Sequence, residues 1–168
     1  MISNKDDPTM GLLKMMHMLG YAGLIPFMFP LCLMLTDLWC GPAKGIGIPW
    51  SVYAPNIFIS YSAIILSFMC GTLWAGWQTI SNNRLARYAL LVSNFLALSA
   101  WSALLLMFIA PVPKVLCVIL LMLGFISLLA TERWMGSGVI VYWRMRLSLT
   151  AIVVILHLIM ITLVIKEF

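Results

Sequence analysis

Five continuous apolar stretches, each about long enough to cross a bilayer, take up most of this chain of 168 residues. A helix needs about 20 apolar residues to cross ~30 Å of hydrocarbon. The stretches show no period-two alternation, which favours helices over the strands of a barrel. Charged residues make up only 9% of the chain, too few for the surface of a water-soluble domain of this size. The sequence therefore predicts an all-α membrane protein.

We predict one domain over residues 1–168, a single bundle of five transmembrane helices. The expected spans are about 15–38, 56–79, 88–110, 113–130 and 145–165. Glycine, proline and asparagine separate them, as is typical of turns. Pro26 and Pro30 lie inside the first span, where proline removes a backbone donor and kinks a helix.

The basic residues predict the orientation of the bundle. Seven of the ten are expected on one side of the membrane, and all five arginines are among them. Because short cytoplasmic loops are rich in Lys and Arg, we expect the N-terminus in the cytoplasm and the C-terminus in the periplasm. Asp6 and Asp7 argue against a mitochondrial presequence, so we expect a bacterial cytoplasmic (inner) membrane. The net charge of +5 predicts attraction to anionic lipid headgroups, with no reason to invoke nucleic acid.

Three segments together resemble a known family. They are residues 19–27 (LGYAGLIPF), residues 61–68 (YSAIILSF) with Gly71 and Trp74, and residues 142–150 (YWRMRLSLT). In order and spacing they resemble the DUF3429 family of bacterial membrane proteins, related to the mitochondrial transmembrane protein 69. The resemblance implies a membrane-embedded fold and no reaction. Leu73 stands where members of the family often carry His or Arg, so no charge is implied there.

The last span carries polar residues at helical spacing. Arg146, Thr150 and His157 fall within about 40° of one another on a helix. His157 lies about 16 Å deeper than Arg146, near the bilayer midplane. Polar groups at that depth usually face protein or a water-filled cavity. We therefore expect these side chains to face the interior, either to contact a ligand or to form hydrogen bonds with a neighbouring helix.

Other spans also carry polar residues at helical spacing. A stripe of Ser60, Ser67, Gly71, Trp74 and Gln78 on the second span indicates either helix packing or the wall of a pocket. We expect any small amphipathic ligand to bind toward the cytoplasmic half, between the first, second and fifth spans, with cations at its polar head and tryptophan against its apolar body. The candidate ligand-binding residues are Lys14, His17, Tyr21, Trp74, Gln78, Arg144, Arg146, Thr150 and His157.

The sequence predicts no metal site and no cofactor. The four cysteines show no CxxC spacing, and only two histidines are present. Catalytic signatures such as HExxH and GxSxG do not occur, and no close pair of carboxylates is expected inside the membrane. We therefore predict a non-catalytic accessory or assembly protein, or a small subunit of a membrane complex. Its expected partners are the bilayer and another membrane protein. The alternative is a binder or transporter of a small lipophilic ligand such as a quinone, a lipid or a tetrapyrrole.

Overall fold

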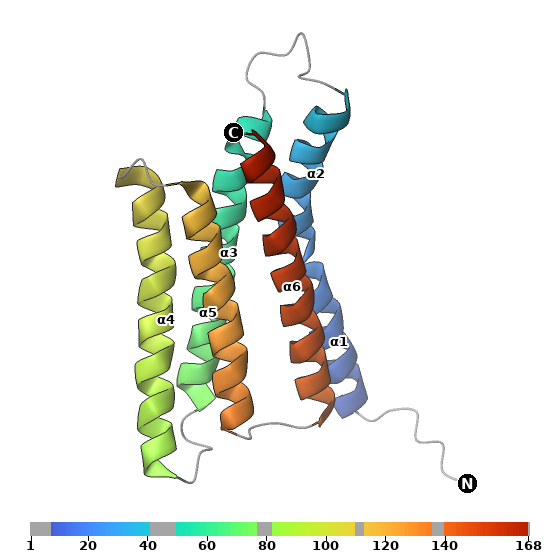
Figure 1. Ribbon diagram of the computed structural model, residues 1–168. Coiled ribbons are helices and arrows are strands. Elements are labelled where there is room, and N and C mark those ends of the chain that lie inside the picture. Colours follow the sequence, from blue (N-terminus) through green and yellow to red (C-terminus); the bar gives the residue numbers. More distant parts are fainter. Residues whose placement is uncertain (1–7, 41–49, 77–81, 110–112, 136–139, 168) are drawn as a thin grey trace, which may run out of the picture.

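The computed structural model describes residues 8–40, 50–76, 82–109, 113–135 and 140–167. Every element in these ranges is helical, and five helical segments are long and apolar enough to cross a membrane, which confirms the predicted fold class. The elements are α1 (Pro8–Ala22), α2 (Ile25–Cys40), the short 3-10 helix η1 (Trp50–Tyr53), α3 (Ala54–Ala75), α4 (Asn83–Ile109), α5 (Lys114–Trp134) and α6 (Ile140–Glu167). The helices run side by side, and the start of α1 and the end of α6 lie at opposite ends of the bundle (Figure 1).

The first span is two helices rather than one. α1 ends at Ala22 and α2 begins at Ile25, because Pro26 has no N–H to continue the helical hydrogen bonds. The Leu24 N–H bonds to the Tyr21 carbonyl at 3.0 Å, a tighter turn than an α-helix makes. The hydroxyl of Tyr61 on α3 donates to the Gly23 carbonyl at 2.9 Å and so pins the break to the bundle. The predicted kink is therefore a helix break just before Pro26.

The boundaries of the other spans also differ from the predicted ones. α5 continues to Trp134, four residues beyond the expected end, and α6 begins at Ile140, five residues before the expected start. The added turns bring Glu132 and Arg144 into helices. Charged residues near the ends of a span can reach the interface or pair with each other, so a charge is a poor marker of where a helix stops.

α3 occupies the middle of the bundle and contacts α2, α4 and α5, while α6 packs against α5 and α2. Small side chains permit close approach on α4, where Ala89, Ala100 and Ala103 are fully buried. Gly124 on α5 meets Leu66 of α3, and a Cβ added there would lie 2.5 Å from the Leu66 Cδ2 atom. Large apolar side chains also cover the outside of the bundle, as is required of a surface that faces lipid.

Candidate functional site

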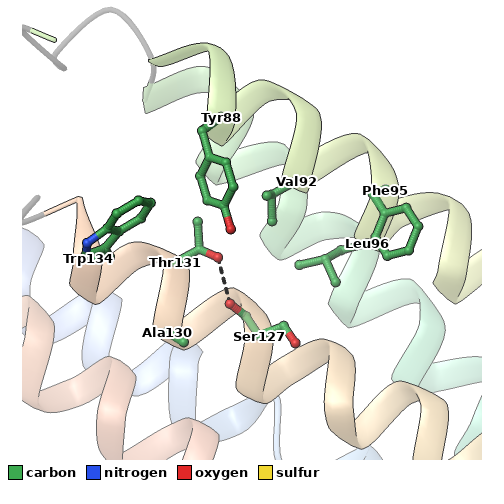
Figure 2. Close-up of a pocket in the computed structure, with 8 residues that line it drawn as sticks. All are labelled: Tyr88, Val92, Phe95, Leu96, Ser127, Ala130, Thr131 and Trp134. Carbon is green, nitrogen blue, oxygen red and sulfur yellow. Dashed lines mark hydrogen bonds between the residues drawn. The ribbon is translucent and has the colours of Figure 1, made fainter. Parts of the chain in front are cut away.

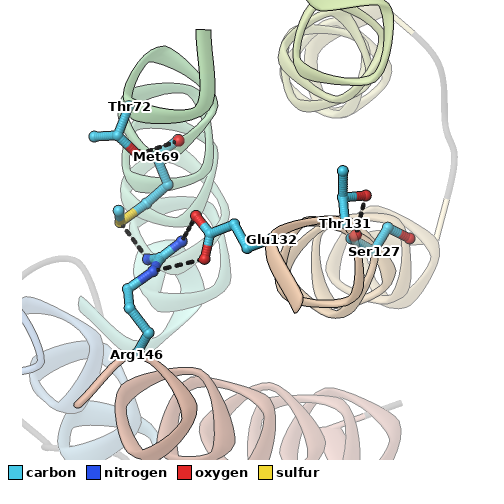
Figure 3. A network of polar contacts seen from close by, with 6 residues as sticks. All are labelled: Met69, Thr72, Ser127, Thr131, Glu132 and Arg146. Carbon is cyan, nitrogen blue, oxygen red and sulfur yellow. Dashed lines mark hydrogen bonds and ion pairs between the residues drawn. The ribbon is translucent and has the colours of Figure 1, made fainter. Parts of the chain in front are cut away.

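A buried ion pair joins three helices near the arginine-rich end of the bundle. The Arg146 guanidinium on α6 donates from Nε to Glu132 Oε2 at 3.0 Å and from Nη2 to Oε1 at 2.5 Å. Its third nitrogen, Nη1, donates to the Met69 sulfur on α3 at 2.9 Å. The two charged side chains are 7% and 9% exposed (Figure 3). This bidentate geometry gives a strong charge-assisted pair. Neither charge is therefore left unpaired in the interior of the bundle.

The ion pair was not among the contacts predicted from the sequence, which ended the fourth span at about Ala130. Arg146 was proposed there as a cation for the polar head of a ligand. In the structure its guanidinium contacts Glu132 and Met69. The sequence did contain a signal for this ion pair. A carboxylate within two residues of the end of one span, followed by an arginine at the start of the next span, is a candidate intramembrane pair.

The second polar contact lies deeper, between α3 and α6. The imidazole of His157 is fully buried, with Nδ1 2.7 Å from the Val153 carbonyl and Nε2 2.7 Å from the Ser62 hydroxyl. A carbonyl only accepts, so Nδ1 carries the proton, and in the neutral ring Nε2 accepts from Ser62. The arrangement satisfies both ring nitrogens and both partners within the bundle.

Aromatic rings enclose this histidine. The centroids of Phe58, Phe125 and Phe27 lie 4.8, 5.6 and 5.9 Å from that of the imidazole. Thr150 is also buried, so the predicted inward face of α6 is confirmed by the burial of Arg146, Thr150 and His157. Their part in ligand binding stays a prediction. In the described structure Arg146 and His157 connect α6 to neighbouring helices.

On α3 the predicted stripe faces the wrong way. Ser67, Gly71 and Trp74 are exposed, and Trp74 keeps 47% of its surface. The helix buries its opposite side through Phe58, Ile59, Ser62, Ala63, Leu66, Cys70 and Leu73. That side makes the contacts with neighbouring helices, because the Ser62 hydroxyl meets His157 of α6 and the Leu66 side chain packs against Gly124 of α5. Gln78 lies outside the described residues.

The remaining candidates lie near the outside of the bundle. Lys14 and Arg144 are exposed, and the rings of His17 and Tyr21 stack at 6.5 Å. Tyr21 donates to the Ser148 hydroxyl of α6 at 3.3 Å, which ties α1 to α6. Trp74 is 47% exposed, Arg146 is paired with Glu132, and none of the proposed ligand residues lines the groove described next.

A groove does exist, but between α4 and α5. Its volume is about 490 Å³, and it is open on one side. Figure 2 shows Tyr88 reaching from α4 toward Ser127 and Thr131 of α5. The groove is lined by Tyr88, Val92, Phe95, Leu96, Ser127, Ala130, Thr131 and Trp134. Within this lining, the rings of Tyr88 and Trp134 meet edge to face, with their centroids 5.4 Å apart.

These features define a multi-pass α-helical membrane protein in which Glu132 pairs with Arg146 and Ser62 with His157 inside the bundle. Within that class, the chain belongs to the DUF3429 family, described as proteins of unknown function, whose profile matches residues 12–162. No curated protein gives a significant match to the chain. No solved structure does so either. The family resemblance seen in the sequence is thus confirmed.

Proposed function

We propose that this protein is a non-catalytic component of the bacterial cytoplasmic membrane, acting as an accessory or assembly protein or as a small subunit of a larger membrane complex. One observation carries the proposal: among the described residues, the buried charged side chains and the buried histidine are paired inside the bundle. Arg146 is occupied by Glu132 and Met69, and His157 by Ser62 and Val153. Such contacts hold helices together and present no reactive group to a substrate.

The distribution of charge supports the proposed orientation, with the N-terminus in the cytoplasm and the C-terminus in the periplasm. The helix ends on the side of the bundle where α1 starts carry five basic residues, Lys14, Arg84, Arg87, Arg133 and Arg144. The helix ends on the opposite side carry Lys114 and Lys166. Arginine-rich loops stay in the cytoplasm during insertion, because moving them across the membrane is costly.

The accessory role is tested by purifying the tagged full chain in a mild detergent and identifying all retained molecules by mass spectrometry. We expect one membrane protein retained in a fixed ratio to the chain, and absent when an unrelated tagged five-span protein is purified in the same way. A chain that elutes free of other proteins in several mild detergents, and that forms no cross-link to one in intact cells, would contradict the role.

A second candidate, the binding of a small lipophilic ligand, is favoured by the groove between α4 and α5. Its volume of about 490 Å³ and its mostly apolar lining match those of small-molecule sites. The same purification separates the two candidates. A quinone or tetrapyrrole retained in a fixed ratio, seen in the absorption spectrum and in solvent extracts, favours the ligand binder over the accessory role.

A further inference from the structure

The lining of the α4–α5 groove changes in character along its length. At the end nearest the arginine-rich side it carries the Trp134 indole and the hydroxyls of Tyr88 and Thr131. One to two turns further along α4 it is mainly apolar, with Val92, Phe95 and Leu96 facing Ser127 of α5. Tryptophan and tyrosine favour the headgroup level of a bilayer, so the groove begins at the interface and runs into the hydrocarbon.

A cation stands at the interfacial mouth of this groove. Arg84 is exposed and lies four residues before Tyr88, so the two side chains share a face of α4. Side chains on a helix lean toward its N-terminus, which directs Arg84 out of the hydrocarbon and toward the headgroups. Arg87 is also exposed but lies about 60° round the helix from Arg84, on the side away from the groove. The guanidinium of Arg133 lies 5.6 Å from the centre of the Trp143 ring and is thus engaged with α6.

From the interface inward, the groove offers a cation, then hydroxyl groups, then a mainly apolar lining. A phospholipid has the matching order of phosphate, glycerol ester and acyl chain. We propose that the groove between α4 and α5 binds one anionic phospholipid, with an acyl chain between the two helices and the phosphate at Arg84. The proposal stands independently of the accessory role, since a bound lipid is compatible with either presence or absence of a protein partner.

The shape of the groove favours a lipid over a helix of another protein. Its α4 lining runs from Tyr88 to Leu96, about 12 Å, whereas a spanning helix would pack along much of the ~30 Å of hydrocarbon. Phe95, in the inner part of the groove, is 71% exposed. This large ring would prevent the backbone of another helix from approaching α4 closely. A flexible acyl chain fits beside it.

The test uses native mass spectrometry of the full chain in detergent, with added palmitoyl-oleoyl phosphatidylglycerol or phosphatidylcholine. We expect tighter binding of the first phosphatidylglycerol than of the first phosphatidylcholine. Arg84→Gln should weaken phosphatidylglycerol binding about fivefold, the effect of one well-placed basic residue on anionic lipid. The matched control Arg87→Gln should change it less than twofold. Ala130→Phe, which fills the groove, should abolish the first binding event for either lipid. Leu116→Phe should not, because Leu116 is exposed on α5 but lies about 21 Å along the helix from Ala130, outside the groove lining.

Several results would overturn the proposal. Equal losses from Arg84→Gln and Arg87→Gln would reveal a general attraction to the basic end. Equal affinity for the two lipids would remove the role of the phosphate charge, and unaltered binding by Ala130→Phe would place the lipid elsewhere. If Ala130→Phe loses a membrane protein that co-purifies with the unaltered chain in a fixed ratio, but still retains lipid, the occupant of the groove would be a helix of that partner. If Ala130→Phe fails to fold, the two arginine variants decide the matter, because both side chains are exposed and their removal disturbs no packing.

Discussion

The contact between Glu132 and Arg146 gives the sharpest prediction about stability. Replacing either residue with methionine removes one member of the pair and leaves the other charge buried without a counter-ion. Replacing both with methionine removes the two charges together and leaves apolar side chains in a bundle whose neighbours are already apolar. The two single variants should therefore each be less stable than the double variant.

The magnitude follows from burial and depth. Removing one member of a buried pair costs about 3–5 kcal/mol in the protein interior. Arg146 lies only about 6 Å along the helix from Tyr142, where the span begins, so an unpaired guanidinium can partly reach the interface. We therefore expect Glu132→Met to lower the free energy of unfolding by about 2–3 kcal/mol, with about 2 kcal/mol of that recovered on adding Arg146→Met. A difference of about 2 kcal/mol is roughly 30-fold in the unfolding equilibrium.

The measurement is reversible unfolding in mixed micelles, with increasing mole fractions of sodium dodecyl sulfate and helix content followed by circular dichroism. Arg144→Met is the matched control, because Arg144 is an exposed arginine two residues away and its loss should change stability by less than about 0.5 kcal/mol. The reasoning is refuted if Glu132→Met behaves like Arg144→Met, or if the losses of the two single variants simply add in the double variant.

Three further predictions concern packing and topology. Ser62→Ala should lower the free energy of unfolding by about 1–2 kcal/mol, because it leaves Nε2 of the buried His157 without a donor. Ser67→Ala, on the exposed side of the same helix, should leave it almost unchanged. Thermal unfolding in detergent compares the two variants, and equal shifts in melting temperature would argue against the Ser62–His157 bond. Gly124→Ala should destabilise the bundle by about 1–2 kcal/mol, because its Cβ meets the fully buried Leu66, whereas Gly71→Ala has open space and should be neutral or slightly stabilising in the same assay. In a chain freed of native cysteines, a cysteine at the exposed Asn83 should resist an impermeant thiol reagent added to intact cells while one at the exposed Lys166 reacts, and the reverse pattern would invert the proposed orientation.

The sequence alone determined the architecture of this protein. Five apolar runs of sufficient length are possible as spanning helices only, because backbone groups in lipid must be satisfied within the segment itself. The same principle predicted the inward face of α6, since three polar residues at helical spacing have few alternatives to facing protein. The break before Pro26 was likewise foreseeable as a kink, although its exact form depended on the Tyr61 hydroxyl of another helix.

Only the tertiary structure decided which helix faces meet. On α3 the predicted polar stripe with Ser67 and Trp74 is exposed, and the opposite side is buried through contacts such as that of Ser62 with His157 and that of Leu66 with Gly124. The pairing of Glu132 with Arg146 and the groove between α4 and α5 depend in the same way on how helices distant in sequence are placed. In water, an apolar stripe marks the buried face of a helix. In lipid the solvent is as apolar as the core, so hydropathy locates the helices but cannot tell which of their faces touch each other.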